Sequence, residues 1–194
     1  VNEQHLSTFG SMENLISAEG GKELIESLPE DGLIILNGNN KYCQALYQET
    51  QKQKKLCGQI NSDLWAEDIK VEKEYISFKV LSKDRKSATF KVNLLGAHNV
   101  ENILTAAAVA KELGMTLREI SSACKKITPE QGGMRFLKGK DGLNIIDSTY
   151  SANPNGVISD IEYLETWQGK KIIIMPCLIE LGSASINVHK KIGE

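Results

Sequence analysis

Two short polar segments and one histidine carry the residue types best suited to ligand binding. The first segment, residues 147–154, directly follows an apolar run and ends at Pro154, which can open a helix. Ligands of open parallel sheets bind beyond the carboxyl ends of the strands, so Asp147 is placed to hold ribose hydroxyls. The ring of Tyr150 could cover a base, and Asn153 completes the polar loop. The alternative is an ordinary capped turn, which Asp and Asn also favour.

The second polar segment, residues 96–102, precedes an alanine-rich run that is typical of a helix. Asn99 can cap this helix, and Asn102 lies about one turn later on nearly the same face. A side-chain amide donates and accepts at the same time, and can therefore pair with the edge of adenine. The alternative is a helix cap that binds no ligand.

The histidine is His5, close to Glu3 near the start of the chain. A histidine can bind a metal, although a lone one is more often a surface residue. The sequence has no G-x-x-x-x-G-K-[ST] phosphate loop, no G-x-G-x-x-G, no H-E-x-x-H and no legible Ser-His-Asp set. These residues therefore predict contacts with the base and ribose of a nucleotide, without a cradle for its phosphates.

The elements that position these segments follow an α/β pattern. Expected helices cover residues 11–28 (weak at Gly20-Gly21), 42–47, 100–113, 117–127 and a run from Pro154; expected strands cover 33–36, 75–81, 88–94, 143–147 and 171–175. The strands at 75–81 and 88–94 alternate apolar and polar residues, which predicts an antiparallel hairpin. Residues 33–36 form a continuous apolar run, typical of a strand buried on both faces. We interpret residues 52–55 as a solvated basic stretch.

Composition excludes several classes of protein. The chain has 194 residues, 41% of them hydrophobic, with 23 Lys+Arg against 25 Asp+Glu and a net charge of −2. This balance argues against a disordered chain and against binding to nucleic acid. No apolar run approaches the roughly 20 residues that span a bilayer, so we expect no membrane insertion. The four cysteines are scattered, which favours reduced thiols in a cytoplasmic protein over a zinc site or disulfides.

Four stretches match sequence motifs in a fixed order. They are residues 5–14 (H-L-x-x-F-G-S-x-E-N), 96–102 (G-x-H-N-x-x-N, followed by alanines), 145–154 (I-I-D-S-T-Y-S-A-N-P) and 180–189 (E-L-G-x-x-S-x-x-x-H). Together they resemble the Mur ligases, the ATP-dependent amide-bond-forming enzymes of peptidoglycan precursor synthesis. Within that family, their order and spacing most resemble the member that adds D-alanyl-D-alanine to UDP-MurNAc-tripeptide.

The resemblance implies a fold, a reaction and its reactants. Residues 1–133 would be the C-terminal part of a central ATP-binding domain, with a parallel sheet plus a small antiparallel sheet. Residues 134–194 would begin a Rossmann-like ligase domain. The reaction would use ATP and Mg²⁺ to join UDP-MurNAc-peptide to D-Ala-D-Ala through an acyl phosphate. The chain starts at Val1 and lacks the phosphate loop, so we expect a piece of a longer monomeric enzyme, inactive alone.

The resemblance implies functional roles only for residues at positions that match the family motifs. By resemblance, His5 is a magnesium ligand, and Lys22 is the nearest lysine to the family's carbamoylated lysine, which makes it the catalytic candidate. The nucleotide-binding positions are His98, Asn99, Asn102, Asp147, Tyr150 and Asn153.

The sequence also departs from the family motifs. Ser148 and Ser151 replace an aspartate and an asparagine, Asn39-Asn40 replaces an acidic pair, and Gly133 stands where the family has an arginine. Other functions therefore stay open: another Mur ligase, a folylpolyglutamate-synthase relative, or a non-catalytic nucleotide-binding module.

Overall fold

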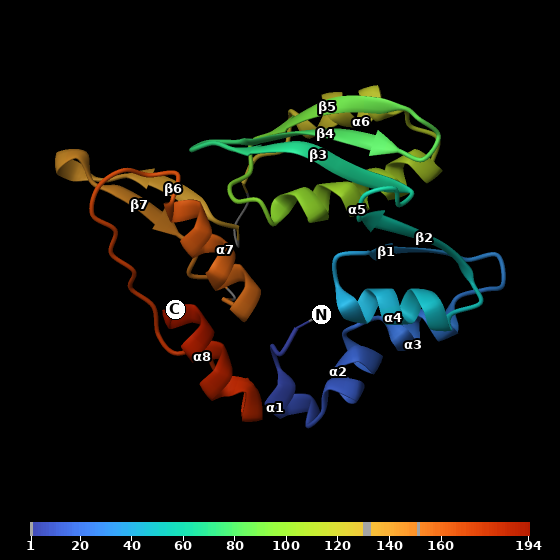
Figure 1. The fold of residues 1–194 in the computed structure, drawn as a ribbon, viewed down its shortest axis with the longest axis horizontal. Helices are drawn as coiled ribbons and strands as arrows, with labels where there is room; N and C mark the ends of the chain where they lie inside the picture. Colours follow the sequence, from blue (N-terminus) through green and yellow to red (C-terminus); the bar gives the residue numbers. More distant parts are fainter. Residues whose placement is uncertain (1, 130–132, 151) are drawn as a thin grey trace.

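A computed structural model describes residues 2–129, 133–150 and 152–194, and a five-stranded mixed sheet lies at one end of it (Figure 1). Its strands are β1 (Leu33–Asn37), β2 (Gln53–Gly58), β3 (Leu64–Val71), β4 (Ile76–Ser82) and β5 (Ser87–Val92), in that spatial order. The pairs β1–β2 and β2–β3 are parallel, and the pairs β3–β4 and β4–β5 are antiparallel. Val1, residues 130–132 and Ser151 lie outside the described residues.

The predicted hairpin is confirmed as β4 and β5. Alternate residues of β4 point inward, as its sequence pattern indicates, and Phe78 lies opposite Phe90 with ring centroids 5.6 Å apart. Strand β3 was not predicted, because its polar second half hides the apolar alternation. It joins β2 to the hairpin and so links the parallel and antiparallel parts of the sheet.

Two helices pack on one face of the sheet, α5 (Asn99–Glu112) and α6 (Leu117–Cys124). Both agree with the predicted helices, and α6 begins with a capping box between Thr116 and Glu119. The core between helices and sheet contains Cys57, Leu64, Ile76, Phe78, Val80, Phe90, Val92, Val100, Ile103, Leu104, Ala107, Ala108, Leu117, Ile120 and Cys124.

The other face of β1 packs on two helices, α3 (Lys22–Ser27) and α4 (Lys41–Glu49). Ile34 and Leu36 are buried there, while Ile35 packs on the α5 side, so β1 is covered on both faces as predicted. The helix predicted over residues 11–28 is two helices, α2 (Met12–Ala18) and α3. The break falls at the predicted weak point, where Gly21 takes a left-handed φ of 89°.

The prediction of a solvated basic stretch at residues 52–55 is wrong, because residues 53–55 enter strand β2 and Lys52 donates to the carbonyl of Leu28 at 2.6 Å. Their ammonium groups bind within the fold: Lys54 Nζ donates to the carbonyls of Tyr47 (2.7 Å) and Thr50 (2.9 Å). The aliphatic part of a lysine side chain can lie along apolar surface while its ammonium group binds a polar partner. A run of lysines therefore does not by itself show that a segment is solvated.

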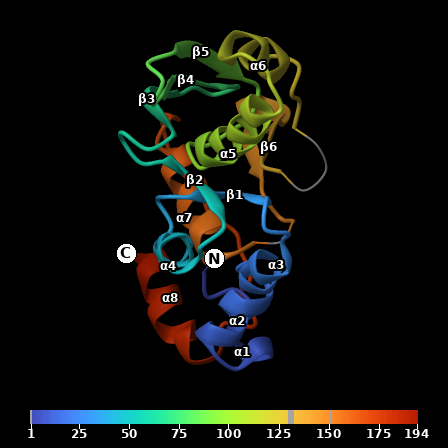
Figure 2. The same cartoon turned by 90° about the vertical axis from the view of Figure 1, so that its right-hand side faces the viewer.

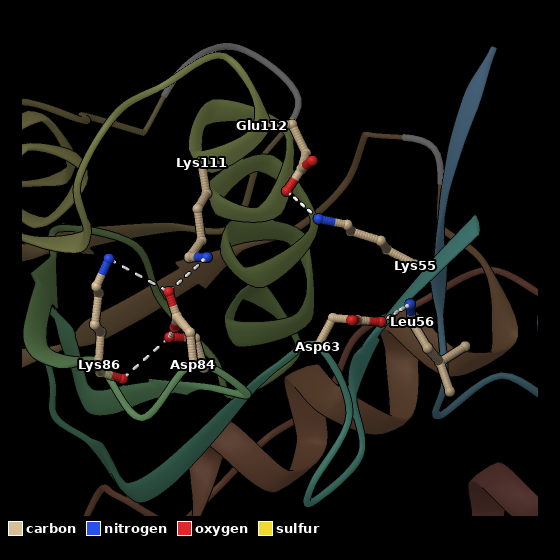
Figure 3. Close-up of polar contacts among 8 residues, drawn as sticks. Lys55, Leu56, Asp63, Asp84, Lys86, Lys111 and Glu112 are labelled. Atoms are coloured by element: carbon tan, nitrogen blue, oxygen red, sulfur yellow. Dashed lines mark hydrogen bonds and ion pairs between the residues drawn. The ribbon is translucent and has the colours of Figure 1, made fainter. Parts of the chain in front are cut away.

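Charged contacts fix the C-terminal end of α5 to the sheet (Figure 3). Lys55 of β2 pairs with Glu112, and Lys111 pairs with Asp84 of the β4–β5 turn at 3.2 Å. Asp84 also pairs with Lys86 at 3.4 Å. The helix is therefore held against both the parallel and the antiparallel part of the sheet.

We call the residues before 134 the first part of the chain and residues 134–194 the second part. The second part carries strands β6 (Arg135–Lys138) and β7 (Asn144–Asp147) and helices α7 (Pro154–Leu164) and α8 (Ser185–Gly193). It also has two short 3-10 turns, η1 (Lys140–Gly142) and η2 (Gly182–Ala184). Strand β7 and helix α7 agree with prediction. The strand predicted at residues 171–175 is wrong: this segment is irregular, and Ile174 is 93% exposed. Among the described residues β7 pairs with β6, which was not predicted, and antiparallel rather than parallel.

The two parts of the chain share a small core. Tyr163 of α7 is buried with Leu95 and Met134, and its hydroxyl donates to the carbonyl of Lys73 at 2.7 Å. At the other end of the molecule, α1 (Leu6–Phe9) lies beside η2 and the start of α8 (Figures 1 and 2). No helix in the described part of the chain is long and apolar enough to cross a bilayer.

Candidate functional site

The start of α5 carries the two predicted adenine-binding amides, and they are hydrogen-bonded to each other. Asn102 Nδ2 donates to Asn99 Oδ1 at 3.2 Å, and Asn99 Nδ2 donates to the carbonyl of Leu95 at 2.7 Å. The N-cap residue is His98, so the prediction that Asn99 caps the helix is wrong. The amide of Asn99 instead ties the preceding loop to the helix, and the exposed amide of Asn102 faces solvent.

His98 lies at the start of α5, close enough to Asp160 of α7 for the charge of Asp160 to act on its ring. Burial lowers the pKa of His98, opposed by the charges of Asp160 and Glu101. Burial also raises the pKa of Asp160, opposed by a hydrogen bond from Ser148 and by the charge of His98. The start of α5 therefore lies near α7, and the hydrogen bond from Ser148 ties Asp160 to the segment after β7.

The packing around His98 depends on a glycine. Gly96 has a φ of 83°, and a Cβ there would lie 2.9 Å from His98 Nδ1. That Nδ1 is buried without a hydrogen-bond partner among the described residues. Asn99 Nδ2 lies 3.1 Å from Nε2, and since an amide nitrogen donates, Nε2 accepts and Nδ1 carries the proton.

Asp147 ends β7 and forms the turn that follows it. Its Oδ1 accepts from the Thr149 hydroxyl at 2.8 Å and from the Thr149 N–H at 3.1 Å. These bonds, together with the charge of Arg135, lower the pKa of Asp147. Tyr150, three residues later, is 68% exposed. The capped turn, the alternative given above, is therefore present. The same loop also carries the anionic side chain of Asp147 and the solvent-exposed ring of Tyr150.

Asn153 is the N-cap of α7, and it also reaches the N-terminal segment. Its Oδ1 accepts from the N–H of Gly156 at 3.0 Å and from Asn2 Nδ2 at 3.1 Å. A second link between the two parts lies nearby along the same segment, where His5 Nδ1 binds Glu180 Oε2 and the Ser7 N–H donates to the Glu180 carbonyl at 3.0 Å.

Lys22 begins α3 and lines an open cavity of about 420 Å³ with Glu13, Asn14, Ile16, Ser17, Tyr42, Ala45, Leu46 and Glu49. None of the other predicted site residues lines this cavity. The described residues thus gather the predicted positions into three groups: the start of α5 with the β7–α7 loop, the His5–Glu180 contact, and Lys22 by itself.

Sequence reasoning missed three residues that the structure adds to these groups. Asp160 is three residues after the buried Val157, so a charge on the apolar face of α7 was a usable signal. Glu180 belongs to a motif that was matched without a role for its carboxylate. Glu101 gave no signal, because an acidic residue in the first turn of a helix is common for local reasons.

The potential metal donors of the described residues are not clustered. No group of three or more His, Cys, Asp or Glu side chains within the described ranges could hold a metal ion. His5 and Glu180 offer one nitrogen and one carboxylate. Magnesium normally keeps several waters and is held by few protein groups together with substrate phosphates, so an ion at His5 would take most of its ligands from a nucleotide and water.

The sequence profile of the Mur ligase middle domain matches residues 1–110 of the chain. The UDP-N-acetylmuramoyl-tripeptide–D-alanyl-D-alanine ligase of Bacillus subtilis is 28% identical over 196 residues. That alignment covers 100% of this chain and 41% of the relative, so the chain spans less than half the length of that curated relative.

Solved structures have the same fold. MurF from Acinetobacter baumannii superposes with a TM-score of 0.88 at 24% identity, covering 100% of this chain and 42% of that one. The MurF ligase of Thermotoga maritima in complex with ADP superposes with a TM-score of 0.79 at 24% identity, covering 100% and 44%. These likenesses extend past the matched profile to the β6–β7 and α7–α8 region.

Proposed function

Because the chain belongs to the Mur ligase family through its middle domain, we propose that it forms part of a D-alanyl-D-alanine-adding ligase. The whole protein would join this dipeptide to UDP-MurNAc-tripeptide at the expense of ATP. The names of the curated relatives support this choice among Mur ligases. A reaction that draws on ATP and nucleotide-linked sugars belongs in the cytoplasm.

The chemistry of the proposed reaction balances without a redox partner. A carboxylate oxygen of the tripeptide attacks the γ-phosphorus of ATP, which releases ADP and gives an acyl phosphate. The amine of D-alanyl-D-alanine then attacks the acyl carbon through a tetrahedral intermediate. Phosphate leaves with the original carboxylate oxygen, and the amine loses a proton as the amide forms. A bound magnesium ion would supply charge neutralisation at the phosphates.

We assign the nucleotide to the junction between residues 1–133 and 134–194, which we propose as the two domain portions. Asn102 would pair with the adenine edge, and Asn99 would hold Asn102 in place through its 3.2 Å hydrogen bond. Asp147 would take a ribose hydroxyl, while Tyr150 and Asn153 would line the cleft. His98 would order the start of α5 rather than contact the nucleotide, because its ring is turned into the fold.

The observation that supports this placement most is the small core in which Leu95, just before the start of α5, is buried with Tyr163 while Ile146, the neighbour of Asp147, packs against them. It brings together the start of α5 and the end of β7, two segments that lie about 50 residues apart and that separately suggested base and ribose contacts. Exposed groups with both donor and acceptor capacity remain there, which fits an adenosine.

The roles of His5 and Lys22 are also proposals. His5 would contribute a magnesium ligand, and its contact with Glu180 fits an ion completed by phosphates and water. Lys22 would be the carbamoylated lysine. Among the described residues that line the same cavity as Lys22, Glu13 and Glu49 carry the carboxylates that could accompany a metal ion there.

The proposal is tested by measuring phosphate release from ATP by the full-length protein. We expect release only when both UDP-MurNAc-tripeptide and D-alanyl-D-alanine are present. Replacement of the dipeptide by L-alanine, D-glutamate or diaminopimelate, each with its matching acceptor, should give no release above background. Release that is unchanged without the dipeptide would contradict the assignment.

A further inference from the structure

We propose that Glu180 is a positioning residue for the bound magnesium ion: its carboxylate holds Nδ1–H of His5 and thereby turns Nε2 of the same ring toward the ion. This inference rests on the proposed role of His5 as a magnesium ligand. It assigns a function to a side chain from the C-terminal part of the chain, 175 residues away in sequence.

The contact between His5 and Glu180 determines which nitrogen of the neutral ring carries the proton. His5 Nδ1 is bonded to Glu180 Oε2. An ionised carboxylate only accepts hydrogen bonds, so the neutral imidazole must carry its proton on Nδ1. The lone pair is then on Nε2, which is the atom left to bind a metal. Metal-binding histidines commonly donate their second ring N–H to a carboxylate in this way, which sets both tautomer and orientation.

Glu180 is itself held against the same segment. Its carbonyl accepts the Ser7 N–H at 3.0 Å, so backbone and side chain both bind the turn that opens α1. Two residues later, a Cβ built on Gly182 would lie 3.5 Å from the Cα of Ser7, which shows how closely the two backbones approach. The carboxylate is therefore aimed at His5 by its own backbone.

The two residues share an unusual backbone conformation. His5 has a φ of 65° and Glu180 a φ of 62°, both in the left-handed region that non-glycine residues seldom adopt. Such conformations persist where surrounding contacts impose them, and they gather at ligand sites. The side chains are 37% and 42% exposed, so the ring is held in place and yet open to a ligand from solvent.

The hydrogen bond between His5 and Glu180 couples metal binding to the contact between the two parts of the chain. His5 belongs to the segment that the middle-domain profile matches, whereas Glu180 lies beyond residue 133. The His5 ring has the orientation and tautomer that metal binding needs only while these parts are in contact. By thermodynamic reciprocity, an ion at Nε2 must in turn favour the contact.

The test uses Mn²⁺ as the probe and the full-length protein bound to one equivalent of a non-hydrolysable ATP analogue. Free Mn²⁺ is measured by electron paramagnetic resonance for wild type, His5→Ala, Glu180→Ala and the double variant. We expect roughly 10- to 100-fold weaker Mn²⁺ binding in each single variant, the usual effect of losing an outer partner of a metal ligand. The double variant should be no weaker than His5→Ala. Glu165→Ala, an exposed carboxylate at the end of α7, serves as the matched control and should bind as wild type.

A second measurement reads the tautomer directly. In ¹⁵N-histidine-labelled protein, the His5 signals should report a protonated Nδ1 in wild type and a shift toward protonated Nε2 in Glu180→Ala. Glu180→Gln keeps an acceptor oxygen and should preserve both the tautomer and most of the Mn²⁺ affinity. These spectra also show whether each variant is folded.

The outcomes separate the two claims. If His5→Ala leaves Mn²⁺ affinity unchanged, the metal role of His5 fails, and this inference fails with it. If His5→Ala weakens binding but Glu180→Ala changes neither affinity nor tautomer, only the positioning role of Glu180 is overturned. A further loss in the double variant would also overturn it, because Glu180 would then act by a route other than His5.

Discussion

Asn37, the last residue of β1, donates from Nδ2 to Oε2 of Glu101 in the first turn of α5 at 2.6 Å. Asn39 donates to the other carboxylate oxygen of the same residue at 3.0 Å. Glu101 immediately precedes Asn102, the proposed adenine-binding residue. The end of the first strand thus fixes the helix turn that carries the base contact, while Lys55 and Asp84 fix the opposite end of the helix.

Replacing Asn37 by aspartate should destabilise the protein. The new carboxylate would face that of Glu101 in place of a donor, which removes a hydrogen bond to a charged group, a loss on the order of 1–3 kcal/mol. Urea unfolding at pH 7 measures the change. Because one carboxylate of the pair can bind a proton in acid, the deficit should shrink as the pH is lowered. Asn144→Asp adds the same charge at an exposed position of β7 and should change stability little.

Replacing Asp147 by alanine should weaken ATP use more than dipeptide use. We expect the KM for ATP to rise about tenfold, equivalent to about 1.4 kcal/mol, with a smaller change in the KM for D-alanyl-D-alanine. Steady-state kinetics of the full-length protein provide the comparison. Thr149→Val, which removes one hydrogen bond to Asp147 and keeps its charge, is the matched control and should have the smaller effect. A larger effect on the dipeptide would remove the ribose role.

The stability of the protein should decrease in mild acid because of His98. Burial lowers the pKa of this histidine from 6.5, against the opposing charges of Asp160 and Glu101. The unfolded chain therefore binds the proton first as the pH falls. The free energy of unfolding should drop below about pH 6.5 and level off once the folded protein is also protonated.

The measurement is the unfolding free energy between pH 5.5 and 8 for wild type and His98→Gln. The variant should lose this part of the slope, while carboxylates other than Asp160 and Glu101 contribute alike to both proteins. Burial raises the pKa of Asp160, whose contribution is lost as the pH rises and so has the opposite sign. Equal slopes in the two proteins would contradict the burial of His98 at the junction.

Replacing Phe90 by alanine should cost about 3–5 kcal/mol of stability, the usual range for removing a fully buried aromatic ring. Its side chain is 0% exposed and stacks with Phe78 in the core under α5 and α6. Leu113→Ala is the control, since Leu113 is 81% exposed. Chemical denaturation should separate the two variants clearly, and similar midpoints would contradict this core.

The elements that the sequence predicted well have strong local signals. Local sequence is enough to explain three of them: the start of α6 at the Thr116 capping box, the hairpin with alternating residues around Phe78 and Phe90, and the helix break at the glycines before Lys22. The elements that it missed depend on partners distant in sequence. Strand β2 contains three consecutive polar or charged residues, and its lysines are satisfied by carbonyls and a glutamate from other elements.

The same contrast applies to the candidate site. Asp147 and Asn102 could be proposed from their types and their places after a strand and at a helix start, and their roles stay predictions. The electrostatic interaction of His98 with Asp160 and the hydrogen bond of His5 with Glu180 join segments far apart in sequence, and only the folded chain reveals them. The apolar run at residues 171–175 shows the opposite failure, because strand propensity without a pairing partner produced no strand.

The most direct test of the central claim follows one oxygen atom. The full-length protein is given ATP, D-alanyl-D-alanine and UDP-MurNAc-tripeptide whose reacting carboxylate carries ¹⁸O. If this chain belongs to a ligase that activates the peptide as an acyl phosphate, the released inorganic phosphate should contain one ¹⁸O per amide bond formed, together with ADP. Unlabelled phosphate, or release of AMP and pyrophosphate in place of ADP, would contradict the account.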